Sequence, residues 1–136
     1  MARVTPLRSI PELYSDFHKD LTLNPVSNDL ARKRNEEAVK ESIKNLILTN
    51  KGERKFQPYL GSDVQNYLFE NITPDIILVI EENIKSLISQ YEPRANVIEV
   101  VAQAAADDNY VDITIVFNVI NSETPVTFTT TLSRIR

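Results

Sequence analysis

The sequence predicts an α+β domain in which helices are followed by a three-stranded antiparallel β-meander. Two observations predict it. Between residues 27 and 91, apolar residues recur at three- and four-residue spacing, as they do on one face of a helix. After residue 95 they recur at every second position, as on one face of a strand. Helices and strands in separate stretches of one chain are typical of the α+β class.

The composition fits one ordinary globular domain. The 136 residues are 42% hydrophobic and 25% charged, and a chain of this length buries about two-thirds of its unfolded surface. The sequence has no run of about 18 apolar residues that would span a bilayer. Its N-terminus also lacks the apolar segment of a signal peptide. We therefore expect no membrane contact and a protein made in a cytosol-like compartment.

Two residue counts limit the chemistry. Cysteine is absent and His18 is the only histidine, which excludes disulfides, thiol nucleophiles and multi-histidine metal sites. We expect no cofactor and no metal. The net charge of −4 is uneven, because residues 1–60 carry eleven Lys/Arg against eight Asp/Glu and residues 61–136 carry four against eleven. Opposite signs suit two different neighbours, but chance segregation is the simpler explanation.

Residues 1–26 are predicted to form an extended arm, with one short turn around residues 12–17, because neither period is sustained there. The domain then occupies residues 27–136. Its first helix is predicted from about Ser27 to a stop at Lys51-Gly52. The opposite face of this helix pairs cations with glutamates at four-residue spacing, which indicates a solvated surface and no nucleic-acid contact. The apolar stripe comprises Ala31, Ala38, Val39, Ile43, Leu46 and Ile47.

A short helix and a second long helix follow. Ser62-Asp63-Val64-Gln65 has the spacing of a capping box, which predicts the start of the short helix. The long helix begins with Thr73 as N-cap and Pro74 at the first helical position. It must end near Tyr91, since Pro93 disfavours helical geometry at the preceding residue. Its apolar face comprises Ile76, Ile77, Ile80, Ile84, Leu87, Ile88 and Tyr91.

The strands are separated by turns at residues 107–109 and 121–124. The middle strand has a fully apolar face from Val111 to Val119. The last strand is rich in threonine and lies at an edge of the meander, where another chain can add a strand. The candidate interface residues on it are Thr127, Phe128, Thr129, Thr130, Thr131 and Leu132.

Glu92-Pro93-Arg94 is a second candidate interface, at the junction of the long helix and the first strand. In an extended segment residues i and i+2 point to the same side, so the carboxylate and the guanidinium lie together on a stiff corner. Such a pair suits bidentate recognition of a partner. Taken alone, the tripeptide is better explained as a helix stop with an exposed ion pair, worth roughly 0–1 kcal/mol.

Over residues 14–136 the sequence resembles the baseplate wedge and sheath-initiator proteins of contractile-tail phages, a family also named lysozyme-like and related to the type VI secretion baseplate. One loop departs from the family pattern: the usual Arg-Pro-Phe-x-Pro-Glu-Phe-Gly reads RKFQPYLG at residues 54–61, without the acid. The matching motifs, in order, are Asn24-Pro25, residues 42–46, residues 49–54, Gly61-Ser62-Asp63, Leu68-Phe69-Glu70 and Glu92-Pro93-Arg94.

The resemblance implies a structural protein of the virion tail baseplate, assembled in the host cytoplasm. It implies that Glu92, Pro93 and Arg94 hold the helical core bundle of neighbouring wedge proteins. It also implies that the sheet is a template for the tail sheath protein, with the tail tube or hub as further neighbours.

A peptidoglycan hydrolase is the alternative function, and a free-standing adaptor outside any tail is a third class supported only by the edge strand. Glycoside cleavage needs two carboxylates across one cleft, one of them with a raised pKa. Arg94 beside Glu92 favours the ionised form, which is wrong for a general acid, and no second lobe is available to form a cleft. Assembly is therefore the favoured interpretation, although a Glu53–Glu70 pair stays open. The acids considered are Glu53, Glu70, Glu81, Glu82 and Glu92.

Overall fold

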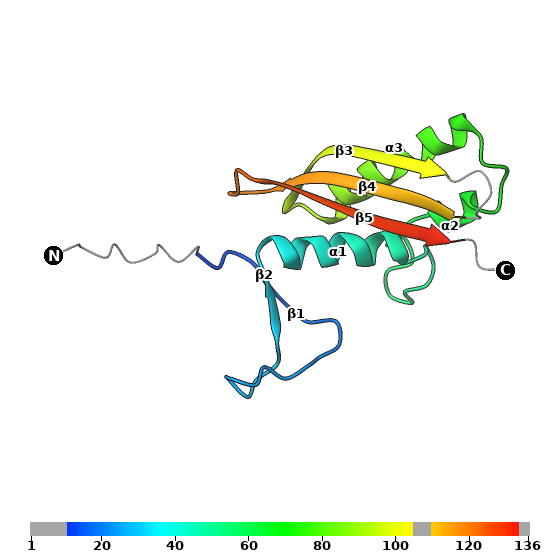
Figure 1. Ribbon diagram of the computed structural model, residues 1–136. Helices are drawn as coiled ribbons and strands as arrows, with labels where there is room; N and C mark the ends of the chain where they lie inside the picture. Colours follow the sequence, from blue (N-terminus) through cyan, green and yellow to red (C-terminus); the bar gives the residue numbers. More distant parts are fainter. Residues whose placement is uncertain (1–10, 105–109, 134–136) are drawn as a thin grey trace. The chain divides into compact units, whose positions relative to one another are not determined.

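The computed structural model describes residues 11–104 and 110–133 (Figure 1). The chain divides into two compact units, with the division between Ala38 and Val39. The predicted α+β class is confirmed: two longer helices and one short helix accompany a three-stranded antiparallel sheet, and a small two-stranded sheet is added. Within the described residues, no helix combines the length and the apolar content needed to cross a bilayer.

The N-terminal unit contains a small β-ribbon in place of the start of the predicted helix. Strand β1 (Ser15–Phe17) pairs antiparallel with β2 (Arg32–Arg34). The prediction of a helix from Ser27 was therefore wrong: Ala31 lies outside any helix, and the cations of β2 belong to a strand. Residues 1–10 of the predicted arm lie outside the described residues.

Helix α1 (Glu36–Leu48) begins directly after a residue whose backbone conformation is not helical. Asn35 adopts a left-handed conformation with φ 48°, which a helix cannot continue through. Its side-chain oxygen accepts hydrogen bonds from the backbone N–H groups of Leu13 and Tyr14, so Asn35 belongs to the ribbon. Two glutamates then occupy the first helical turn, where negative charge is favoured.

The loop after α1 closes on the C-terminal end of the helix. The Ser62 hydroxyl donates to the Ile47 carbonyl at 2.6 Å, and the Ser62 N–H donates to the Thr49 carbonyl at 2.8 Å. These bonds satisfy carbonyls that the helix end leaves unpaired. Gly61 has φ 126°, and a Cβ there would lie 2.4 Å from the Thr49 oxygen, so only glycine fits this approach.

Helices α2 (Val64–Tyr67) and α3 (Pro74–Tyr91) follow. The predicted capping box at α2 was wrong, because the Ser62 hydroxyl is engaged with α1 and Asp63 takes the N-cap position without a side-chain hydrogen bond. The prediction for α3 was confirmed. The Thr73 hydroxyl accepts from the Ile76 N–H, Pro74 is the first helical residue, and the helix ends at Tyr91.

The three-stranded sheet has the order β3 (Ala95–Ala104), β4 (Tyr110–Val119) and β5 (Pro125–Ser133), all antiparallel, and α3 packs against β3 (Figure 1). The predicted turn at residues 107–109 lies outside the described residues. On β4 alternate residues from Val111 to Val119 are buried, as predicted. Phe117 packs edge-to-face on Phe128 with ring centroids 6.0 Å apart, which joins β4 to β5 in the core.

Candidate functional site

The side chains of Glu92 and Arg94 lie together, as predicted from their i, i+2 spacing, but the predicted extended segment was wrong: Pro93 and Arg94 form a turn, in which the Ala95 N–H donates to the Glu92 carbonyl. The Arg94 guanidinium donates to both carboxylate oxygens of Glu92, with Nε to Oε1 at 2.6 Å and Nη2 to Oε2 at 2.8 Å. This bidentate arrangement fixes the guanidinium plane as well as its position. The interpretation as an exposed ion pair does not fit, because the Glu92 side chain is 4% exposed and that of Arg94 29%.

Glu92 is held from a second element. Burial raises the pKa of Glu92, but hydrogen bonds from Arg94 and from Ser42 on α1, together with the Arg94 charge, outweigh it, so the pKa lies below its ordinary value. Sequence reasoning missed Ser42. A signal for it was present, since Ser42 stands three residues after Val39 and four before Leu46, within the apolar stripe of α1.

The corner is also tied to the sheet. The Ala95 N–H donates to the Glu92 carbonyl at 3.1 Å, and the Ile120 N–H donates to the Arg94 carbonyl at 2.9 Å. Pro93 stays exposed between these two anchored residues. The corner thus presents Pro93 and part of the Arg94 side chain to solvent on a backbone that is fixed on both sides, while the Glu92 carboxylate is directed inward.

The register of the sheet identifies which backbone groups face the outer edge of β5. Ala102 on β3 donates its N–H to a side chain outside the sheet, so the Ala102↔Ile113 pair is not hydrogen-bonded. Ile113 therefore directs its N–H and C=O groups toward β5, where it pairs with Thr130. Alternation then places the N–H and C=O groups of Thr129 on the outer edge.

The six candidate residues of β5 separate into two sets. Backbone groups of the first set face the outer edge, and their side chains are exposed on the sheet surface, where Thr129 contacts Thr114 and Thr131 donates to Asp112. Side chains of the second set are buried in the core and their backbone groups pair with β4. The first set comprises Thr127, Thr129 and Thr131, and the second Phe128, Thr130 and Leu132.

Two of the carboxylates considered for hydrolysis accept hydrogen bonds from backbone N–H groups in different parts of the fold. Glu53 accepts from the Asn50 N–H at 3.0 Å, and Glu81 accepts from the Ala102 N–H. A depression of about 460 Å³ lies between the loop after α1 and the end of α3, but its one acid is Asp63, which pairs with Lys51. In residues 11–104 and 110–133, no group of three or more His, Cys, Asp or Glu side chains could hold a metal ion.

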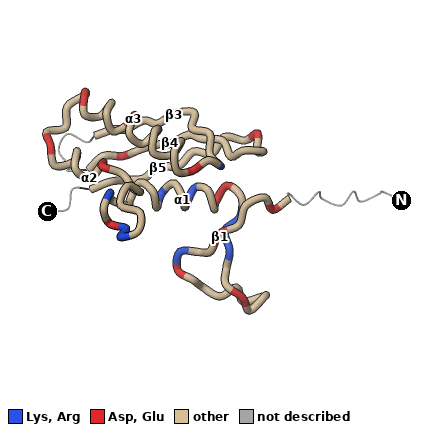
Figure 2. Tube along the Cα trace, turned by 180° about the vertical axis from the view of Figure 1, so that it is seen from behind, with Lys and Arg blue, Asp and Glu red and all other residues tan. Residues whose placement is uncertain are grey.

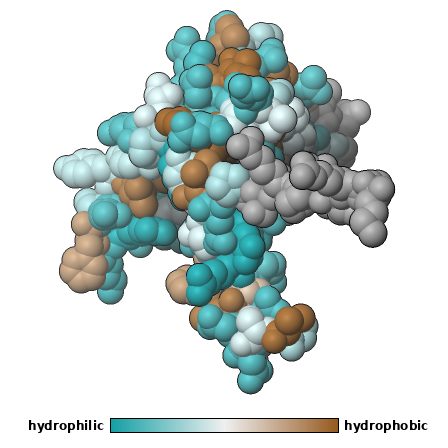
Figure 3. Space-filling model, turned by 90° about the vertical axis from the view of Figure 1, so that its left-hand side faces the viewer, coloured by the Kyte–Doolittle hydropathy of each residue, from teal (hydrophilic) through white to brown (hydrophobic). Residues whose placement is uncertain are grey.

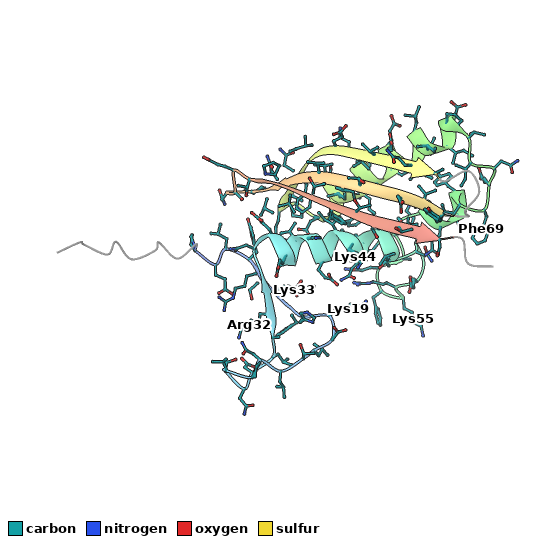
Figure 4. The ribbon with its side chains drawn as sticks, in the orientation of Figure 1. Lys19, Arg32, Lys33, Lys44, Lys55 and Phe69 are labelled. Carbon is teal, nitrogen blue, oxygen red and sulfur yellow. The ribbon has the colours of Figure 1, made fainter. Side chains whose placement is uncertain are left out.

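The surface of the described residues is mixed in charge and in hydropathy. Figure 2 shows basic positions on the loop after α1 and acidic positions on α3. Phe56 in this loop is fully exposed and Tyr59 is 81% exposed, while Lys55 projects from the loop and Phe69 lies beside α2 (Figure 4). On the face shown in Figure 3, apolar side chains form small separate areas among polar ones.

Comparison with known proteins identifies the family. Residues 33–124 match the family described as Baseplate wedge protein gp25. Baseplate wedge protein gp25 of Enterobacteria phage T4 is 34% identical over 116 residues, which cover 85% of this chain and 87% of the phage protein. The chain belongs to the gp25 baseplate wedge family. The matched range contains the corner and all of β3 and β4.

Solved structures of similar fold extend the comparison for this gp25 family member. A proposed tail lysozyme of Geobacter sulfurreducens has 26% identity and a TM-score of 0.68, covering 74% of this chain and 92% of that one. A chain of the anti-feeding prophage baseplate has 21% identity and a TM-score of 0.62, covering 90% of this chain and 87% of that one. The second likeness shows the fold alone.

The lowered pKa of Glu92 predicts a pH-dependent stability. Above the ordinary value of 4.5, the ionised carboxylate stabilises the folded chain; as pH falls through the lower folded pKa, this contribution is lost. Glu92→Gln should therefore reduce the free energy of unfolding by about 2 kcal/mol at pH 7, the effect of hydrogen bonds to a charged group. The difference from wild type should shrink below pH 4.5.

Urea denaturation between pH 7 and pH 3 measures this difference. Glu82→Gln, at an exposed position on α3, is the control for removing one negative charge. A Glu92→Gln deficit that stays constant across the pH range would contradict the role given to the ionised carboxylate.

Proposed function

We propose that this chain is a structural baseplate wedge protein of a contractile tail, located in the virion tail baseplate after assembly in the host cytoplasm. Its two contact sites are the Glu-Pro-Arg corner, which binds the helical core bundle of neighbouring wedge proteins, and the outer edge of β5, which starts the tail sheath by strand addition. Membership of the gp25 family carries the proposal, and the geometry of the corner and the edge supports the two contacts.

The corner suits a helical partner because its cation is positioned before binding. Glu92, held by Ser42 and by Arg94, fixes the guanidinium plane, which reduces the conformational entropy lost when a partner docks. A guanidinium forms two parallel hydrogen bonds to a carboxylate. A cation is also favoured beside the C-terminal carbonyls of a helix, so a helical bundle offers both kinds of group. The exposed ring of Pro93 adds a rigid apolar contact beside the cation.

The β5 edge suits a sheath strand because its backbone groups are regularly spaced. Thr127, Thr129 and Thr131 offer N–H and C=O groups at every second position, and β4 and β5 pair without a register shift. Main-chain hydrogen bonds to such an edge give affinity, and side chains at alternate positions set the register of the added strand.

Proline at Thr129 should uncouple sheath attachment from folding. The Thr129 N–H faces the outer edge, so Thr129→Pro removes a donor from the partner's ladder and leaves the ladder with β4 intact. One main-chain hydrogen bond contributes about 1 kcal/mol, so sheath attachment should fall at least about fivefold. Electron microscopy of assembly products should show baseplates and tubes without sheath.

Two control variants accompany this experiment. Thr129→Val keeps the N–H and should give sheathed tails. Thr130→Pro breaks the β4 ladder and should unfold the chain. If folded Thr129→Pro protein still gives normally sheathed tails, strand addition at β5 is contradicted.

Removing the guanidinium should act earlier in assembly. Arg94→Ala leaves the buried Glu92 without its cation, which should destabilise the chain by about 3 kcal/mol, the lower end for a broken buried pair, because Arg94 is partly exposed. Few complete baseplates should form. Arg94→Lys keeps a cation beside Glu92 but lacks the planar fork, so it should fold better and still assemble poorly. Normal baseplates from both variants would disprove the corner contact.

Hydrolysis of peptidoglycan is the second candidate function, favoured by the likeness to a proposed tail lysozyme. We expect no catalysis, because Glu53 is engaged by a backbone N–H and Glu92 has a lowered pKa. Glu53→Gln and Glu70→Gln should therefore complement tail assembly fully. Pure wild-type protein should release no peptidoglycan fragments; release that either variant abolishes would establish the enzyme instead.

A further inference from the structure

The two edges of the three-stranded sheet differ in how their backbone groups are occupied. On β3, the Ala102 N–H faces away from β4 and donates a 2.8 Å hydrogen bond to Oε1 of Glu81 on α3. Ala102 is buried and Glu81 is half-buried. A helical carboxylate therefore occupies the donor that a strand adding to β3 would need.

The same edge is interrupted near its other end. The β3–β4 register shifts between Val97 and Glu99, so that Ile98 has no partner on β4. Such a bulge disturbs the regular spacing of N–H and C=O groups that an added strand must match. A strand approaching β3 thus meets a bulge in the first half of the edge and the Glu81 carboxylate in the second.

The β5 edge has neither feature. Its pairing with β4 runs without a shift from Asn118↔Pro125 to Tyr110↔Ser133. Within residues 11–104 and 110–133, no hydrogen bond other than those of the β4 ladder reaches the β5 backbone. Pro125 lies on the same alternation as Thr127 and Thr129, so its missing N–H is on the outer edge and costs the sheet nothing.

We infer that Glu81 closes the β3 edge and thereby makes β5 the edge to which a partner strand adds. The inference rests on the proposed function, because it specifies which edge the sheath strand uses. An incoming strand at β3 would have to displace a charge-assisted hydrogen bond. Its own carbonyl oxygens would also lie beside a carboxylate, which repels them. Glu81 is accordingly a specificity-determining residue for assembly.

Amide hydrogen exchange tests the closure in the free chain. The Ala102 amide should exchange slowly in wild type, although it faces away from its only ladder. Glu81→Ala should accelerate this exchange by about 10- to 100-fold, the effect of losing one hydrogen bond to a charged acceptor. Glu81→Gln keeps an oxygen acceptor at the same place and should preserve most of the protection. Equal exchange in wild type and in folded Glu81→Ala protein would overturn the closure.

Thiol crosslinking tests edge selection. Because the chain has no cysteine, Gln103→Cys reports on β3 and Thr127→Cys on β5. The probe is the full-length sheath protein of the same tail. When Glu81 is unchanged, the Thr127→Cys variant should crosslink to it and the Gln103→Cys variant should not. In the Glu81→Ala background, crosslinks at Gln103→Cys should appear, both to the sheath protein and between two copies of the chain. The Glu81→Gln background should behave as wild type.

The outcomes separate the inference from the proposed function. If the sheath protein crosslinks at neither position, strand addition fails, and the crosslink between copies in Glu81→Ala still decides whether Glu81 closes β3. Crosslinks of the Gln103→Cys variant with Glu81 unchanged would overturn the inference. It would equally be overturned if Glu81→Ala exposes the Ala102 amide and yet gives no crosslink at Gln103→Cys.

Discussion

The buried hydrogen bonds of Glu92 are the interaction on which the rest of the C-terminal unit, Val39–Arg136, depends. The carboxylate lies where α3 ends and β3 begins, and it is reached by Ser42 from α1 and by Arg94 from the corner itself. An unpaired carboxylate in this position would lower the free energy of unfolding by several kcal/mol. Because α1 and the corner both supply partners to Glu92, the pairing favours the arrangement in which these elements meet. The corner consequently holds a rigid, partly exposed cation, and in the contact proposed above the same bonds that stabilise the fold position that cation.

Much of this unit follows from local sequence. Helix α3 was predicted at both ends because Thr73-Pro74 and Pro93 restrict the backbone within a few residues of themselves. The meander was predicted because alternation on β4 is uninterrupted. Local signals failed where a distant partner competed. The start of α1 is set by the pairing of β2 with β1, and Ser62 is taken from its capping position by the Ile47 carbonyl.

The candidate interfaces show the same division. The proximity of Glu92 and Arg94 was predicted from their i, i+2 spacing, but the turn that brings them together and the contact of the carboxylate with Ser42, 50 positions earlier in the sequence, were not. On β5 the sequence predicted a threonine-rich edge strand and six candidate interface residues. It could not show which N–H groups face outward, because that depends on the register of all three strands, which the Ala102 hydrogen bond reveals.

The carboxylates of this chain are acceptors for defined donors. Glu53 accepts from a backbone N–H at the end of α1, Glu81 from an edge N–H of β3, and Glu92 from the Arg94 guanidinium. A glycosidase needs one acid that stays protonated. For Glu92 the Arg94 guanidinium holds the pKa of the carboxyl below its ordinary value, which favours the ionised form and opposes general acid catalysis.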